Sequence, residues 1–100
     1  MVEFRVVRDE NAIRVELGTQ MTAAEVPQLQ ALLKQEIDGG IRNVALDCSQ
    51  VTFLDSFAVS LLLAVENSVR KADGSFRLIK VSPAIMTLFK GLGLIGRFGL

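Results

Sequence analysis

Apolar and polar residues alternate along the opening of the chain. In residues 2–7 and again in residues 13–17 the apolar positions recur every second residue, which is the spacing of a half-buried strand. The polar segment at residues 8–11 has the length of a hairpin turn, and Gly18 follows the second run. The pattern predicts that the chain opens with two antiparallel strands.

Two segments farther along repeat apolar residues with helical spacing. The first is predicted to begin near Glu25, because Pro27 prefers the first turn of a helix, and to end at the glycines 39–40. The other begins at Ser82-Pro83, which places proline at the first helical position. Their predicted apolar stripes are Val26, Leu29, Leu33 and Ile37 in the first helix, and Ile85, Leu88, Phe89 and Leu92 in the other.

Short apolar runs at residues 43–48 and 76–81 predict two further strands, the first of them covered on both faces. Strands that alternate with helices imply right-handed parallel crossovers. The sequence contains no linker, repeat or low-complexity block. We therefore predict a single α/β domain over residues 1–100, with a mixed, mostly parallel sheet, an antiparallel N-terminal hairpin and a cover of α-helices.

The strongest helical periodicity follows Asp55-Ser56 and continues to residues 73–74. Serine and aspartate are both favoured N-caps, so an ordinary capping role for Ser56 is one interpretation. If Asp55 is the N-cap, Ser56 becomes the first helical residue and its hydroxyl is free. Unpaired N–H groups and the helix dipole favour an added negative charge at that position. The predicted core stripe of this helix is Ala58, Leu61, Leu62, Val65, Val69 and Ala72.

The opposite side of the same helix carries Val59 and Leu63 together with Glu66 and Arg70. We expect these two apolar side chains to be exposed near Ser56. A pair of exposed apolar residues beside a candidate modification site indicates a docking surface. Cover by a neighbouring loop is an equally open interpretation.

Composition limits the classes of function. Eleven basic residues balance eleven acidic ones, which argues against binding by bulk attraction to nucleic acid or to an anionic membrane. The longest uncharged helical stretch, residues 56–65, is too short for a membrane span. No secretory signal precedes Glu3, and a lone cysteine forms no internal disulfide, so we expect a cytoplasmic protein.

Candidate catalytic and ligand sites are weak. The chain has no histidine, which removes the commonest general base and metal ligand, so we predict neither a catalytic nor a metal site. Asp47 is interpreted as a turn residue and Cys48 as a partly buried core residue. The sequence GLGLIG at residues 91–96 matches a dinucleotide fingerprint only formally, because it follows a predicted helix rather than a strand.

The segment VALDCS at residues 44–49, followed by VTFLDS at residues 51–56, resembles the signature of STAS domains, especially bacterial anti-sigma factor antagonists. The similarity extends over nearly the whole chain, because the hairpin, helices and strands occur in the family's order. The resemblance implies a partner-switching protein with no cofactor of its own. In such proteins the phosphorylated serine immediately follows the signature aspartate, which corresponds to Ser56 after Asp55.

The resemblance implies that the unmodified protein binds an anti-sigma serine kinase, that phosphorylation releases it, and that a phosphatase resets it. We expect the partner-binding surface to comprise Asp55, Ser56, Phe57, Val59, Ser60 and Leu63. The chain has FAVS at residues 57–60, where many antagonists have a small hydroxyl residue followed by Gly-Leu-Gly. This difference favours the alternative, an unphosphorylated STAS subunit of a transporter or another signalling complex. A small-molecule or nucleotide sensor is a third interpretation.

Overall fold

The computed structural model describes residues 4–100. Its elements follow one another in the order β1 (Arg5–Asp9), β2 (Ala12–Glu16), β3 (Gln20–Met21), α1 (Val26–Asp38), β4 (Asn43–Asp47), β5 (Phe53–Leu54), α2 (Ser56–Lys71), β6 (Ser75–Ile79) and α3 (Pro83–Gly91). Among these residues, no helix is both long and apolar enough to cross a bilayer.

The main sheet has four strands in the order β1-β2-β4-β6. The β1–β2 pair is antiparallel, whereas β2–β4 and β4–β6 are parallel. The predicted mixed α/β sheet with an antiparallel N-terminal hairpin is therefore confirmed. Its first strand begins at Arg5, and the part of the prediction that falls on residues 2 and 3 lies outside the described residues.

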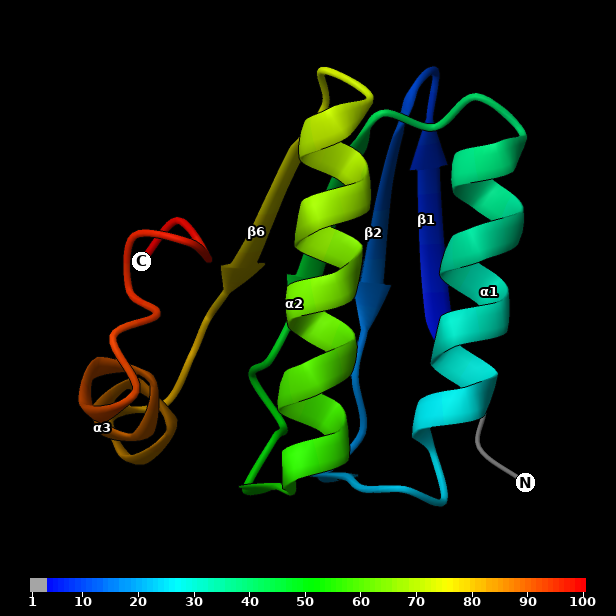
Figure 1. Ribbon diagram of the computed structural model, residues 1–100. Coiled ribbons are helices and arrows are strands. Elements are labelled where there is room, and N and C mark those ends of the chain that lie inside the picture. The colour runs from blue at the N-terminus through cyan, green and yellow to red at the C-terminus, as the bar shows by residue number, and fades with distance from the viewer. Residues whose placement is uncertain (1–3) are drawn as a thin grey trace.

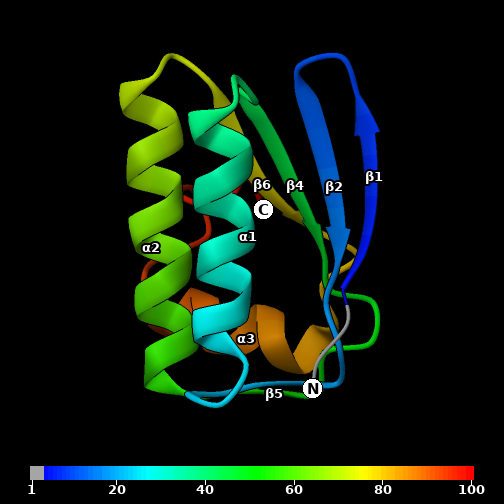
Figure 2. The same ribbon diagram turned by 90° about the vertical axis from the view of Figure 1, so that its right-hand side faces the viewer.

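Helices α1 and α2 lie side by side on one face of this sheet (Figures 1 and 2). The core fills the space between them and the sheet, because alternate strand residues point toward the helices. Val15, Leu46 and Leu78 are paired across three strands and are almost fully buried. The prediction that the strand at 43–48 is covered on both faces was wrong: Val44 and Leu46 are buried, but Ala45, which strand alternation places on the opposite face from Val44 and Leu46, is half-buried.

The sequence patterns missed a second, two-stranded sheet formed by β3 and β5. Gln20 pairs with Phe53 and Met21 with Leu54, in parallel orientation. Strands of two residues are too short to show alternation, so no periodicity announces them. This small sheet joins the segment before α1 to the segment before α2.

The predicted starts of α1 and α3 are confirmed. Helix α1 begins at Val26, after a turn in which the Glu25 carboxylate accepts from the Thr22 N–H at 2.9 Å. Ser82 caps α3, with proline at its first position. The predicted apolar stripe of α3 was partly wrong, because Ile85 and Phe89 are buried but Leu88 and Leu92 are exposed.

The segment after α3 folds back against the edge of the sheet next to β6 (Figure 1). Phe98 is fully buried, and its ring makes edge contacts with Phe89 and Phe76 at centroid distances of 5.1 and 5.9 Å. The Phe98 carbonyl accepts from the Leu78 N–H at 3.1 Å. The glycine-rich stretch at residues 91–96 lies at the end of a helix rather than after a strand, as predicted. Its first glycine, Gly91, is the last residue of α3, and the rest of the stretch follows the helix.

Candidate functional site

Asp55 determines the geometry at the start of α2. Its backbone is extended, and one carboxylate oxygen, Oδ1, accepts from the Ala58 N–H at 2.9 Å. Asp55 is therefore the N-cap, and Ser56 is the first helical residue, as the second interpretation of the sequence predicted. Ser56 is exposed. Its hydroxyl is left uninvolved in the cap, because Asp55 already performs that function.

The second carboxylate oxygen of Asp55, Oδ2, accepts from the Ala23 N–H at 2.9 Å. The Asp55 N–H in turn donates to the Met21 carbonyl at 3.1 Å. One side chain thus holds both the first turn of α2 and the loop before α1. Sequence reasoning missed the contact with Ala23, because the partner is 32 positions away and is brought there by the β3–β5 pairing.

We expect Asp55→Ala to lower the free energy of unfolding by about 2 kcal/mol, because it removes a cap and leaves two N–H groups without their charged acceptor. Asp55→Asn should lose less, since its amide retains one acceptor oxygen. Urea denaturation measures both values. The matched control is Asp38→Ala, which removes an exposed ion pair with Lys34 and should leave stability nearly unchanged. Equal stabilities for Asp55→Ala and Asp38→Ala would contradict this role.

The surroundings of Ser56 are apolar on one side. The Phe57 side chain is 62% exposed and Phe53, on β5, is 52% exposed. Ser60 is also exposed, one turn along the helix. Helix α3 lies at the same end of the molecule as the start of α2 (Figures 1 and 2), and both Leu88 on α3 and Leu92 directly after it are exposed. Large exposed apolar side chains gathered at one end are typical of a binding surface.

The predicted exposure of Val59 and Leu63 was wrong. Both side chains are half-buried and pack against the core. Glu66, expected on the same exposed side, is only 7% exposed. Phe57 therefore provides the most exposed apolar side chain near Ser56, and Val59 and Leu63 contribute only part of their surface.

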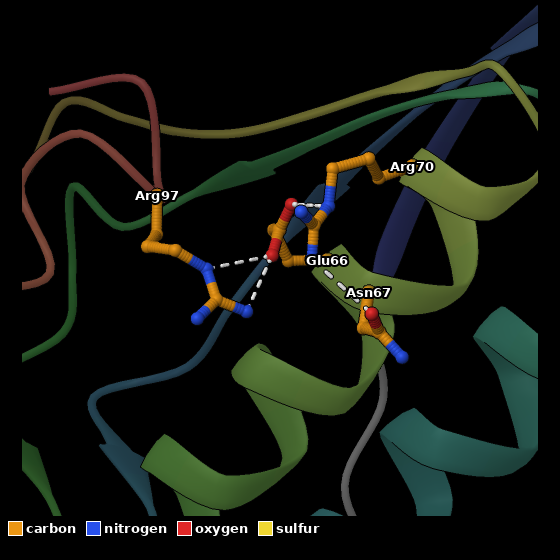
Figure 3. Close-up of polar contacts among 4 residues, drawn as sticks. All are labelled: Glu66, Asn67, Arg70 and Arg97. Atoms are coloured by element: carbon orange, nitrogen blue, oxygen red, sulfur yellow. Dashed lines mark hydrogen bonds and ion pairs between the residues drawn. The ribbon is translucent and has the colours of Figure 1, made fainter.

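Figure 3 shows why this side of α2 is covered. Arg97, from the segment after α3, donates to Oε1 of Glu66 through Nε at 2.9 Å and through Nη2 at 2.8 Å. Arg70 Nε lies 3.2 Å from the other carboxylate oxygen. Paired guanidinium groups compensate the buried carboxylate. The C-terminal segment is thus fastened to α2, and the face that the helical wheel assigns to solvent is occupied.

Two carboxylates already lie close together near the start of α2. The Glu25 carboxylate accepts from the hydroxyl and the N–H of Thr22, and these hydrogen bonds lower the pKa of Glu25, whereas the nearby charge of Asp55 acts in the opposite direction. Glu25 and Asp55 are therefore close enough to interact. A phosphate on Ser56 would be a third anionic group at this end of the molecule.

Asp47 and Cys48 have structural roles. Asp47 is buried, accepts from the Ser49 N–H at 2.9 Å and lies 3.6 Å from Lys80 Nζ. Its pKa is lowered, chiefly by the hydrogen bond from Ser49. Burial raises the pKa of the Cys48 thiol to about 12, which leaves no reactive thiolate at neutral pH. Within residues 4–100, no three acidic or cysteine side chains are grouped to hold a metal ion.

Known proteins resemble this chain over most of its length. A family model described as "Mlab, STAS domain" matches residues 4–98. BtrV of Bordetella bronchiseptica, whose name assigns it provisionally to the anti-sigma factor antagonists, is 27% identical over 78 residues, covering 78% of this chain and 67% of BtrV.

Solved structures share the fold. SpoIIAA, a Bacillus cell fate determinant, in its phosphorylated form superposes with a TM-score of 0.79 at 20% identity, covering 96% of this chain and 87% of SpoIIAA. The anti-sigma factor antagonist SpoIIAA in its unphosphorylated form gives a TM-score of 0.76 at 19% identity, covering 88% and 82% of the two chains. The arrangement of helices and strands around Ser56 is therefore one that other proteins also adopt.

Proposed function

The chain belongs to the STAS domain family, and from this we propose that it is a cytoplasmic anti-sigma factor antagonist switched by phosphorylation of Ser56. In this proposal the unmodified protein binds an anti-sigma serine kinase, and the kinase releases it by transferring a phosphoryl group from ATP. A phosphatase then resets it. The protein contributes a surface and an acceptor hydroxyl, and the kinase contributes the chemistry.

One observation carries the proposal: Asp55 caps α2, so that Ser56 is exposed at the first helical position, and within residues 4–100 its hydroxyl has no hydrogen-bond partner. Further support comes from the relatives, since SpoIIAA is described both in a phosphorylated form and as an anti-sigma factor antagonist. The exposed Phe57 next to Ser56 supplies an apolar group for a partner to bury.

The energies favour a switch rather than an unfolding event. Phosphorylation adds about 1.5 to 2 negative charges at pH 7. A helix N-terminus stabilises such a charge by about 0.3 to 2 kcal/mol, so the isolated domain tolerates it. In a complex that covers Phe57 the same group would be removed from water, and burying a poorly paired anion costs several kcal/mol. Phosphorylation therefore penalises the complex and spares the fold.

We expect Phe57→Ala to weaken binding of the unmodified protein to its anti-sigma kinase by about 2 kcal/mol, or roughly thirtyfold, because exposed aromatic residues commonly anchor interfaces. Isothermal titration calorimetry with the candidate kinase measures this. The matched control is Val7→Ala, which truncates another exposed apolar side chain on the opposite face of the sheet and should bind normally. Wild-type affinity for Phe57→Ala would place the interface elsewhere.

The residues after Ser56 favour a second candidate, an unphosphorylated STAS subunit of a transporter or another signalling complex. Many antagonists have a small hydroxyl residue at the position of Phe57 and glycines at those of Ala58 and Ser60, and glycines there would leave more room for a kinase loop. Under this alternative the same face would hold a constant partner, and Ser56 would pack without being modified. The two candidates differ in one measurable property, since only the first predicts a kinase that phosphorylates Ser56.

A further inference from the structure

The face of the main sheet opposite α1 and α2 carries a row of side chains that the proposed function does not use. Strands β1, β2, β4 and β6 pair residue with residue, so their outward-facing side chains form rows across the sheet. The middle row consists of Val7, Arg14, Ala45 and Arg77. Both arginines in this row are exposed, and between them stands a small alanine side chain.

Arg14 and Arg77 differ from the other arginines in having no partner among the residues that the structure describes. Within residues 4–100, neither side chain forms an ion pair or a hydrogen bond. The other five arginines each do so: Arg5, Arg8, Arg42, Arg70 and Arg97. The two arginines whose donors are unused thus lie in the same row of the sheet, separated by one strand.

A depression of about 590 Å³ lies between them. Arg14 and Arg77 line it on either side, and Ala12 and Ala45 contribute only small side chains to it. Because neighbouring strands are about 4.8 Å apart, the Cα atoms of the two arginines are separated by roughly 10 Å. Two arginine side chains at this separation are long enough to approach one anionic group from opposite sides.

The positive charge on this face is local. Arg5 lies 3.9 Å from Glu16 in the adjacent row, and Lys80, directly after β6, lies 3.6 Å from Asp47 in that row, so these two basic groups are already paired. The chain as a whole has no net charge. A nucleic acid or an anionic membrane requires an extended basic surface, which this face does not offer. The two unpaired guanidinium groups of Arg14 and Arg77, on either side of this depression, suit a small anion.

We propose that this depression binds a small molecule bearing a phosphate group, held between Arg14 and Arg77 over Ala45. A guanidinium group presents paired N–H donors that match phosphate oxygens, and two of them balance the charge of a phosphate monoester. Ser75 lines the same depression and donates its hydroxyl to Asn43 at 2.8 Å, which leaves its oxygen free to accept from a ligand hydroxyl. This site is separate from Ser56 and does not depend on the proposed switch.

The test is an NMR titration of the isotope-labelled protein with inorganic phosphate and with glucose 6-phosphate, at constant ionic strength. We expect saturable shifts of the amide signals of Ala12, Ala45 and Ser75, with glucose 6-phosphate binding more tightly than inorganic phosphate. Arg14→Ala and Arg77→Ala should each weaken binding roughly tenfold or more. The matched control, Arg5→Ala, removes a paired arginine from the same face and should leave the affinity unchanged.

Three results would overturn the proposal. The first is the absence of saturable shifts, or equal shifts with chloride, which would indicate a general salt effect. The second is binding that Arg14→Ala and Arg77→Ala leave intact. The third is tight binding of a hexaglutamate peptide to these arginines in place of the phosphate compounds, which would identify the row as a surface for an acidic protein segment. The spectra also show whether each variant is folded.

Discussion

Phosphorylation of Ser56 is expected to weaken binding to the anti-sigma kinase about a hundredfold or more. The phosphate would lie between Asp55 and the exposed Phe57, on the surface proposed to contact the partner. A hundredfold loss requires only about 2.7 kcal/mol, which is less than the several kcal/mol that burial of a poorly paired anion costs. Titration of the kinase with the purified phosphorylated and unphosphorylated proteins measures the difference.

A fold control accompanies this experiment. The phosphorylated protein should unfold within a few degrees of the unmodified one, because the helix N-terminus offsets part of the added charge. Ser56→Asp should weaken binding in the same direction but less, since it carries one negative charge and fewer acceptor oxygens. Equal affinity of the phosphorylated and unphosphorylated proteins would remove the basis for partner switching.

Phe98→Ala is expected to lower the free energy of unfolding by about 3 to 5 kcal/mol. The side chain is fully buried, contacts the rings of Phe76 and Phe89, and belongs to the segment that Arg97 fastens to Glu66. For a domain of this size each kcal/mol corresponds to about 4 to 8 °C, so the melting temperature should fall by roughly 12 °C or more. Differential scanning calorimetry measures the change.

The matched control is Phe57→Ala, which makes the same substitution at a side chain that is 62% exposed. It should leave the melting temperature almost unchanged while weakening the partner complex. The two variants thus separate stability from binding. A small loss of stability for Phe98→Ala would mean that the C-terminal segment contributes little to the core.

The parts of the structure that follow local rules could be predicted from the sequence. The helix from Ser56 to Lys71 has a long apolar period, so its existence was predictable, whereas the sequence left its cap open between Asp55 and Ser56 and the structure assigns it to Asp55. The opening hairpin and the starts of α1 and α3 were predictable for similar reasons, because alternation, proline and serine act over a few residues. The two-residue strands β3 and β5 gave no local signal.

The errors concern contacts between segments distant in sequence. A helical wheel assigns Val59, Leu63 and Glu66 to solvent, but Arg97, which is 31 positions beyond Glu66, brings the C-terminal segment over that side. The opposite error occurred on α3, where the wheel counts Leu88 as a core residue although it is exposed. Likewise, Arg14 and Arg77 lie in the same row of the sheet only because of the register of three strands, which local sequence patterns do not reveal. Periodicity indicates which side of an element is apolar, and the tertiary structure decides what covers it.

The proposed switch requires that Ser56 accept a phosphoryl group from an anti-sigma serine kinase. The most direct test is incubation of the wild-type protein and Ser56→Ala with the candidate kinase, ATP and magnesium, followed by intact-mass measurement. We expect the wild-type protein to gain the mass of one phosphoryl group and Ser56→Ala to gain none. A wild-type protein that stays unmodified, or a Ser56→Ala variant modified to the same extent, would contradict it.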